Sequence, residues 1–259
     1  MVRKGQHGRK PDRAALKKKE IIYGLNPVKE SIRAGKRKIF SIYLLKRRSD
    51  FFHNIIEEAE RKNIRIIFSD EREIEKMASS STHQGIAAEI SPYPYLSIDD
   101  FLKEVSDKED SFVLFLDGIT DPMNFGSIIR SALLFGVDYI VTEERNCAPV
   151  TATVCKASAG AVEHMKIVVV TNLVKLAERL KDIGFWIYGA DAEASHSIRE
   201  MDFPKKKVIV LGSEGKGIRR LLKTVCDDLF FIPTTRVIDS LNVSAAASVI
   251  LSHLYSFKK

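Results

Sequence analysis

Short, dense runs of apolar residues alternate with amphipathic stretches along the chain from Ser111 onward. Six of these runs predict strands, over residues 112–116, 139–142, 166–170, 185–189, 207–211 and 230–232. The main helices are predicted over 124–135, 173–183, 218–224 and 243–255. Runs that stay apolar on consecutive positions are typical of a parallel sheet covered on both faces. The pattern therefore predicts an α/β doubly wound domain, in which ligands bind at the carboxyl ends of the strands.

A smaller α/β unit is predicted before this domain. Its expected strands cover 39–45, 64–68 and 85–90, and its expected helices begin at Asn26-Pro27 and cover 51–62 and 71–77. The proline-rich stretch 92–95 and the polar stretch 106–110 indicate a junction. We therefore expect a tail over 1–19, a first domain over 20–91, a linker over 92–110 and a second domain over 111–259.

Charge changes the picture at the beginning of the chain. The formal net charge of +7 arises from 41 Lys and Arg against 34 Asp and Glu, and the whole excess lies in residues 1–19. This tail has no apolar periodicity, so we expect it to be disordered in isolation. It is either a solvated, solubilising end or an arm that gains affinity for phosphates by releasing counterions.

A second basic cluster occupies the twenty residues from Lys29 to Arg48, in which Glu30 is the one acidic residue. It contains Lys29, Arg33, Lys36, Arg37, Lys38, Lys46, Arg47 and Arg48. Clustered positive charge within a neutral body indicates a polyanionic partner.

Other classes are disfavoured by what the sequence lacks. No apolar run approaches the ~20 residues that a membrane span needs, and the basic N-terminus has no apolar core of a signal peptide, so we expect a cytoplasmic protein that binds no membrane. Cys147, Cys155 and Cys226 have no CxxC spacing and are predicted to be buried, unreactive thiols. The six histidines are scattered, so no metal site is expected.

Three loops that follow predicted strands have an unusual composition. In the first, Asn124 suits a helix N-cap and Gly126 allows a close backbone approach. Arg130 follows early in that helix, and taken alone it is best explained as the partner of a carboxylate at the helix edge. The composition of each of the other two loops can likewise be explained by the fold alone, without a ligand.

The second loop holds glycines 212, 215 and 217 around Glu214. It matches neither the dinucleotide fingerprint nor the P-loop, and it either forms a simple turn or packs its backbone against a flat ligand. The third loop contains Ile232-Pro233, followed by Ser240-Leu241-Asn242-Val243-Ser244. It forms either a helix N-cap with a tightly packed small-residue face or part of the same ligand site.

Taken in order, the three loops resemble the motifs of the SpoU family, the TrmH-like branch of the SPOUT RNA methyltransferases. The resemblance rests on Asn124-x-Gly-x-x-x-Arg130, Leu211-Gly-x-Glu214-Gly-x-Gly217, and the third loop. Lys156–Ala161 and Cys226-Asp227 are similar to further family segments. Tyr23–Val28 and His83–Ile86 are similar to the ends of an L30e-like substrate-binding domain found in many members. The resemblance spans about residues 20–257.

The resemblance implies a homodimer whose α/β catalytic domain holds a deep trefoil knot, with S-adenosylmethionine bound in the knot. It places the cofactor-binding role on Leu211, Gly212, Gly217, Ile232, Pro233, Leu241 and Asn242. It places Arg130 at the nucleophilic hydroxyl, with the site shaped by Asn124, Glu214, Ser240 and Asn242. Because a guanidinium stays protonated in proteins, we expect Arg130 to stabilise negative charge or to position a phosphate. No metal is required.

One departure concerns cofactor affinity. Arg236 stands where the family usually has glycine, and Thr234 where methionine is common. An arginine beside a cationic sulfonium is electrostatically unfavourable unless its side chain points away.

The implied reaction is methyl transfer to a ribose 2′-hydroxyl in structured RNA. By family analogy a guanosine of large-subunit ribosomal RNA is favoured, with RNA contacts expected from Lys29, Arg33, Lys36, Arg37, Lys38 and Arg47. The alternatives are a transfer RNA 2′-O-methyltransferase and, because of Arg236, a non-catalytic RNA-binding or ribosome-assembly factor. A nucleotide-dependent enzyme on an ordinary Rossmann sheet is disfavoured, since the glycine fingerprint and the acid ~20 residues beyond it are absent.

Overall fold

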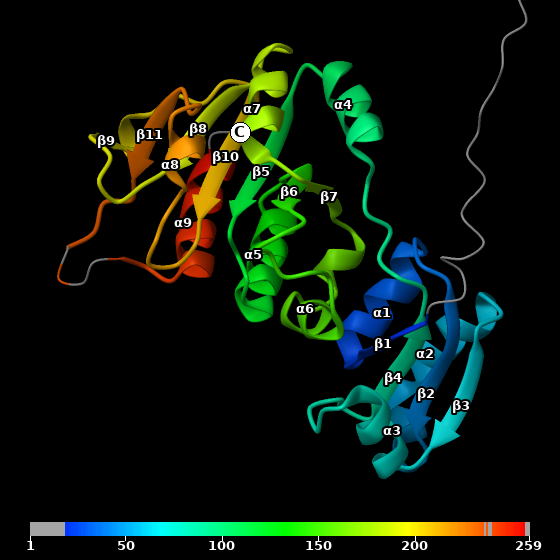
Figure 1. The fold of residues 1–259 in the computed structure, drawn as a ribbon. Helices are drawn as coiled ribbons and strands as arrows, with labels where there is room; N and C mark the ends of the chain where they lie inside the picture. The colour runs from blue at the N-terminus through cyan, green and yellow to red at the C-terminus, as the bar shows by residue number, and fades with distance from the viewer. Residues whose placement is uncertain (1–18, 236, 238–239, 257–259) are drawn as a thin grey trace, which may run out of the picture. The chain divides into compact units, whose positions relative to one another are not determined.

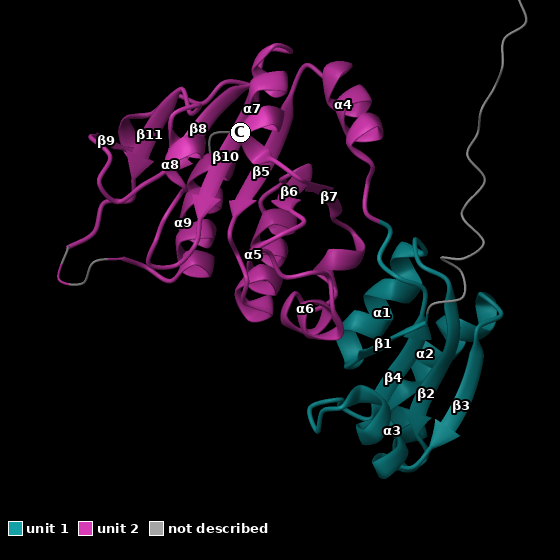
Figure 2. Cartoon of the chain, in the orientation of Figure 1, with its two compact units in different colours: residues 1–94 teal, residues 95–259 magenta. Residues whose placement is uncertain are grey.

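The structure is a computed structural model that describes residues 19–235, 237 and 240–256. The chain divides into two compact units, residues 1–94 and 95–259, which are described separately (Figure 2). The predicted basic tail lies outside the described residues except for Lys19, which forms an ion pair with Glu89 at 2.8 Å.

The first unit is built on a four-stranded mixed sheet with the order β1-β4-β2-β3. β4 is antiparallel to both β1 and β2, whereas β2 and β3 are parallel. Apolar residues on both faces of β4 are buried, so both faces of this strand are covered. The strands are β1 (Glu20–Tyr23), β2 (Ile39–Leu45), β3 (Arg65–Ser69) and β4 (Ile86–Ile90).

The helices of this unit each bury one apolar face. Val28 and Ile32 lie four residues apart on one helix, and Ile55 and Ala59 do the same on another, which is the spacing of one helical face. The helices are α1 (Leu25–Ala34), α2 (His53–Arg61) and α3 (Glu71–Ala78), and the 3-10 segment η2 (Lys46–Phe52) precedes α2 (Figure 1).

The second unit contains a sheet of seven strands in its described part, with the order β7-β6-β5-β10-β8-β11-β9. Every neighbouring pair in this sheet is parallel. All seven residues of the central strand β5 are buried. The strands are β5 (Ser111–Asp117), β6 (Tyr139–Glu143), β7 (Lys166–Val170), β8 (Trp186–Ala190), β9 (His196–Ser197), β10 (Lys206–Gly212) and β11 (Asp228–Phe231).

Helices cover both faces of this sheet, as Figure 1 shows. Val113 and Phe115 of β5 pack with residues of α4, α7 and α8 in one apolar cluster. The intervening residues of β5 face the opposite side, where α5 packs against α6 and α9. The helical elements are α4 (Ile98–Ser106), α5 (Pro122–Leu134), α6 (Ala152–Ala157), η3 (Ala161–Glu163), α7 (Leu173–Lys181), η4 (Ile198–Glu200), α8 (Arg220–Lys223) and α9 (Val243–Ser256).

The α/β architecture with a parallel sheet is confirmed, and three details differ from the expectation. Residues 92–110 are not simply a linker, because they contain α4, whose Phe101 and Val105 are buried in the second unit. α5 is capped by Asp121, whose carboxylate accepts from the amides of Met123 and Asn124, so Asn124 lies in the first turn and is not the cap. The short elements β1, β9 and α6 were not predicted. The trefoil knot stays a prediction.

No helix in the described part of the chain is both long and apolar enough to cross a membrane.

Candidate active site

A pocket of about 730 Å³ opens at the carboxyl ends of β8, β10 and β11, beside the first turns of α9. This is the edge at which parallel sheets bind ligands. Its lining combines apolar side chains with backbone of the second loop, residues 212–217, which we call the glycine loop. The lining residues are Ala190–Glu193, Leu211–Gly217, Lys223, Phe230–Ile232, Thr234, Ser240, Leu241, Val243, Ala246 and Ile250.

Gly212 allows two backbone segments to meet at the floor of this loop. Ser213 and Gly217 exchange backbone hydrogen bonds of 3.1 and 2.9 Å, which fold the loop back on itself. A Cβ atom at position 212 would lie 2.0 Å from the carbonyl carbon of Gly217. Only glycine fits there, because no side chain can occupy space that another backbone already fills.

Asn242 joins the three loops into one polar cluster, defined by Asn124, Glu214 and Asn242. The side-chain amide of Asn242 donates to Asn124 Oδ1 at 3.1 Å and to Glu214 Oε1 at 3.4 Å. Its Oδ1 accepts from the backbone amides of Ser244 and Ala245 and so caps the N-terminus of α9. With its donors and its acceptor occupied, Asn242 holds the other two groups in place.

Arg219 fixes the other end of the glycine loop. Its Nε donates to Asp117 at 2.6 Å, its backbone amide donates to the same carboxylate at 2.8 Å, and its Nη2 contacts Glu143 at 2.6 Å. The Asp117 side chain is fully buried at the end of β5. Burial lowers the pKa of Arg219, but the Glu143 hydrogen bond and the two carboxylate charges outweigh it and raise the pKa overall. This ion-pair network ties the loop to the ends of β5 and β6.

Among the described residues that line the pocket, acidic groups are in slight excess. Asp191, Glu193 and Glu214 line it against Lys216 and Lys223. Asp191 is paired with Lys223. Burial raises the pKa of Asp191, but the hydrogen bonds from Lys223 and from the Glu193 amide hold it below its usual value. A pocket with this balance suits a ligand that carries positive charge.

Arg130 lies apart from the pocket and from the polar cluster. It is exposed on α5, and none of the carboxylates in the described part of the chain lies within ion-pair distance of it. The sequence alone favoured a pairing of Arg130 with a carboxylate at the helix edge, and the described part of the chain shows no such pair. Met123 and Leu134, also on α5, are 55% and 66% exposed, as is unusual for such large apolar side chains.

The predicted site residues separate into three groups. Leu211, Gly212, Glu214, Gly217, Ile232, Ser240 and Leu241 line the pocket. Asn124 and Asn242 join Glu214 in the polar cluster beside it, and Pro233 and Arg130 belong to neither. Arg236 falls outside the described residues, so its effect on the pocket stays a prediction.

The sequence reasoning missed the Arg219 network and the Asp191–Lys223 pair. A signal for part of the network was present. Asp117 directly follows the predicted strand 112–116, and Glu143 directly follows the predicted strand 139–142. Both therefore lie at the sheet edge where functional groups gather.

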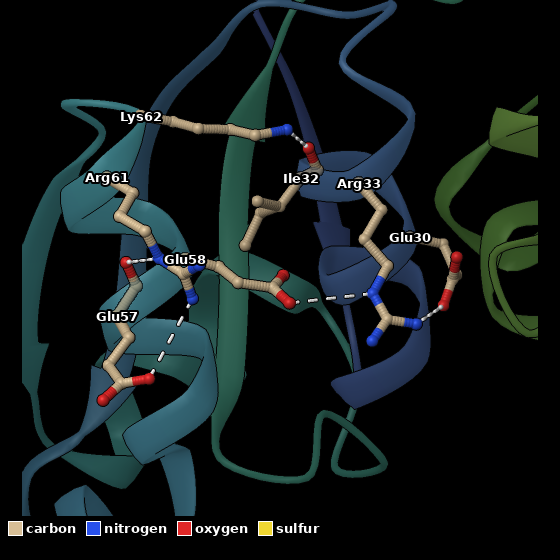
Figure 3. Close-up of polar contacts among 7 residues, drawn as sticks. All are labelled: Glu30, Ile32, Arg33, Glu57, Glu58, Arg61 and Lys62. Carbon is tan, nitrogen blue, oxygen red and sulfur yellow. Dashed lines mark hydrogen bonds and ion pairs between the residues drawn. The ribbon is translucent and has the colours of Figure 1, made fainter.

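The basic residues of the first unit that were expected to contact RNA are interleaved with carboxylates. Lys29 lies in the middle of α1 and Arg33 near its end, while Lys36 and Lys38 follow that helix. Figure 3 shows Arg33 between Glu30 and Glu58, at 3.2 and 3.7 Å, with Lys62 donating to the carbonyl of Ile32. This end of the unit therefore carries mixed charge.

Arg37 requires a correction. Its side chain is only 1% exposed, its Nε donates to the carbonyl of Ser91 at 2.7 Å, and its guanidinium contacts Glu20 at 2.8 Å. A buried guanidinium with these partners stabilises the fold and is not accessible to a polyanion. Arg47, in contrast, is exposed and pairs with a surface carboxylate, that of Glu71.

Asn242→Asp should separate the two tasks of this residue. The carboxylate still caps α9, so the melting temperature should stay near that of the wild type, but it can no longer donate to Asn124 and it faces the Glu214 carboxylate. We expect turnover to fall by about tenfold to a hundredfold, as for a misplaced catalytic group. Ser244→Ala is the matched control, since it removes a hydrogen bond to Asn242 Oδ1 but keeps both bonds that the Asn242 amide donates to Asn124 and Glu214. Equal activity of Asn242→Asp and the wild type would contradict the role.

Arg219→Ala should lower the free energy of unfolding by about 1–2 kcal/mol, because buried Asp117 loses a charged partner although the arginine itself is half-exposed. Urea unfolding measures this loss. Arg220→Ala, at the next and also exposed position, should change it by less than about 0.5 kcal/mol. Equal losses for both variants would refute the assigned anchor.

Two family models match the chain. Residues 111–252 match the SpoU rRNA methylase family. Residues 21–96 match the family described as RNA 2′-O ribose methyltransferase substrate binding.

Similar proteins agree with these matches. A Staphylococcus haemolyticus protein assigned to the TrmH family of tRNA/rRNA methyltransferases is 38% identical over 237 residues, covering 91% of this chain and 94% of its own. The SpoU methyltransferase AviRb of Streptomyces viridochromogenes, solved with AdoMet, is 20% identical with a TM-score of 0.77, covering 93% and 90%. An AdoMet-bound rRNA methyltransferase of Sinorhizobium meliloti is 20% identical with a TM-score of 0.76, covering 92% and 87%.

Proposed function

Since the chain belongs to the SpoU rRNA methylase family, we propose that it transfers a methyl group from S-adenosylmethionine to the 2′-hydroxyl of a ribose in structured RNA. The description of the matched N-terminal family, substrate binding by RNA 2′-O ribose methyltransferases, supports the choice of the ribose hydroxyl. The observation that carries the proposal is the pocket lined by the second and third loops, beside the polar cluster that joins them to the first.

The residues of this pocket fit S-adenosylmethionine. Its volume of about 730 Å³ lies within the range of cofactor sites. Leu211, Ile232 and Leu241 offer apolar contact to a flat adenine, and Gly212 lets the backbone of the loop fold tightly enough to form the pocket wall. The excess of acid around the rim suits the sulfonium and the amino group. When bound, the cofactor supplies an electrophilic methyl group.

The polar cluster beside the pocket positions the acceptor. Asn242 donates its amide hydrogens to Asn124 and Glu214, and these two bonds do not use the amide group of Asn124 or the second carboxylate oxygen of Glu214. These groups can donate to and accept from a ribose, and their fixed geometry lowers the entropic cost of orienting it. The 2′-hydroxyl must also pass its proton to solvent water as its oxygen bonds to the methyl group, and the charge that develops on this oxygen needs a cation.

Arg130 supplies that cation in the proposed mechanism, acting in the pocket of a second copy of the chain. Three features of Arg130 support this arrangement. Its side chain is exposed, it lies further along α5 than the polar cluster, and α5 carries exposed apolar residues as well. Met123, Leu134 and Val249 expose between 45% and 66% of their surface on α5 and α9, which pack against each other. Such apolar surface is typical of a homodimer interface.

Large-subunit ribosomal RNA is the favoured substrate, with transfer RNA as the alternative. The name of the Staphylococcus haemolyticus relative mentions both ribosomal and transfer RNA, and the choice of the large subunit rests on family analogy. Mapping 2′-O-methyl groups in ribosomal and transfer RNA, from cells with and without the gene, tests the proposal. A ribosomal position that loses its methyl group supports it, and unchanged methylation of all RNA contradicts it.

Calorimetry with S-adenosylmethionine separates the enzyme from a non-catalytic RNA-binding factor. The factor is the alternative that Arg236 motivates, because an extra cation near the cofactor site opposes sulfonium binding. Binding supports the enzyme, whereas a clean absence of binding by folded protein would favour the factor.

A further inference from the structure

The two ends of the sheet in the first unit differ in charge and in exposed aromatic surface. At the end where α1 stops, basic residues are interleaved with carboxylates, as the contacts of Arg33 with Glu30 and Glu58 illustrate (Figure 3). At the other end, β2 runs into η2, which holds Lys46, Arg47 and Arg48 against a single acid, Asp50. The η2 segment itself therefore carries a net charge of +2, and one of its cations, Arg47, pairs with Glu71 of α3.

An aromatic side chain projects from this basic segment. The Phe51 side chain is 57% exposed, whereas its neighbour Phe52 is fully buried and meets it edge to face, with ring centroids 5.2 Å apart. Phe52 also packs close to Gly85, where a Cβ would lie 3.4 Å from its ring. The buried ring therefore anchors the segment, and Phe51 is not needed to fill the core.

Arg48 covers the ring of Phe51 with its guanidinium carbon 4.6 Å from the ring centroid. Arg48 is itself exposed, and its backbone departs from helical geometry, with φ of −125° and ψ of 23°. Two planar groups of the kind that stack on nucleobases thus lie together at the surface. Unpaired bases in RNA stack on aromatic rings and on guanidinium planes, and phosphates need neighbouring cations.

We propose that Arg48 and Phe51 form a stacking site for an unpaired base of the RNA, with Lys46 and Arg47 contacting the adjoining phosphates. The site rests on the proposed function only in taking RNA as its ligand. An apolar protein partner would leave three cations of η2 beside its interface, whereas an RNA strand satisfies both the ring and the charges. The unit would thereby favour RNA with an open loop over a continuous duplex.

Phe51→Ala should lower the affinity for a hairpin RNA with an unpaired loop by about tenfold or more, the usual effect of losing one stacked base. Its affinity for the fully paired duplex of the same stem should not change. The salt dependence should also stay as in the wild type, because no charge is removed. Fluorescence of 2-aminopurine placed in the loop should respond to the wild type and to Phe51→Trp, but not to Phe51→Ala.

Phe68→Ala is the matched control. Phe68 is 50% exposed on β3 in the same unit, and no arginine or lysine is found stacked on it in the described part of the chain. Arg47→Gln provides a second comparison, since it should reduce the salt slope by about one while retaining the 2-aminopurine response.

The outcomes separate the two proposals. If the wild-type protein methylates RNA but binds the hairpin no more tightly than Phe51→Ala does, the stacking site is overturned and the proposed function stands. Equal losses for Phe51→Ala and Phe68→Ala, or equal losses on hairpin and duplex, would also overturn it. Wild-type protein that binds S-adenosylmethionine but no RNA would overturn both the stacking site and the proposed function.

Discussion

Arg130→Ala is expected to lower the rate of RNA methylation by about a hundredfold to a thousandfold, the usual effect of removing one group that stabilises developing negative charge. The fold should survive, because Arg130 is exposed and makes no ion pair within the described residues. S-adenosylmethionine affinity should stay within about twofold, since the residue does not line the pocket of its own chain. Single-turnover assays with saturating cofactor measure the rate, and calorimetry measures the affinity.

Arg179→Ala is the matched control, because Arg179 is an equally exposed arginine on α7, which packs on the other face of the sheet. It should retain full activity. Retained turnover by Arg130→Ala would remove its assigned role.

Mixed dimers test whether Arg130 acts across an interface. Arg130→Ala keeps an intact pocket, and a pocket variant such as Gly212→Ala keeps an intact arginine. If the arginine acts in the partner's pocket, each mixed dimer contains one complete site, and random mixing should restore about a quarter of wild-type activity. If the arginine acts within its own chain, no dimer is complete and the mixture should stay inactive.

Gly212→Ala is expected to weaken S-adenosylmethionine binding by about a hundredfold, because the added methyl group meets the backbone of Gly217 at 2.0 Å and the loop must move. The loop supplies much of the pocket wall, so a shift there changes the shape that the cofactor meets. The melting temperature should also fall by several degrees, since overpacking costs about 1–3 kcal/mol. Calorimetry and thermal unfolding measure the two effects.

Gly215→Ala is the control within the same loop. A Cβ at Gly215 meets nothing within 4 Å, although its φ of +77° makes any side chain mildly strained. We expect a cost of about 1 kcal/mol and a small change in cofactor affinity. Similar cofactor affinities for Gly212→Ala and Gly215→Ala would show that the close approach at Gly212 is not what shapes the pocket.

The sheet of the second unit was predictable because its central strands are buried on both faces, which leaves uninterrupted apolar runs such as that of β5. The start of α5 was misjudged, because Asn124 suits a cap. Asp121-Pro122 was the stronger signal, since proline is favoured at the first position of a helix. β9 has only two residues, too few for any periodicity.

The pocket residues were predictable from ordered motifs, but their connections were not. Asn124 and Asn242 are 118 residues apart, and Asp117 and Arg219 are 102 apart, so only folding reveals that they bond. Burial of a charge is similarly hidden: Arg37 looks like its neighbours in sequence, yet Glu20 and Ser91 enclose it.

The packing of α4 decides how the second unit can be produced as a separate fragment. A fragment that begins at residue 111, where the match to the methylase family begins, would lack α4 and would expose the apolar surface that Phe101 and Val105 now cover. Tyr139 would lose both its edge-to-face contact with Phe101 and its hydrogen bond to Glu104. Bare apolar surface of this kind promotes aggregation. A fragment that begins at Tyr95 keeps α4 over this apolar surface and also keeps the pairing of Leu96 with Val168 of β7. It should remain monodisperse under conditions in which the shorter fragment precipitates.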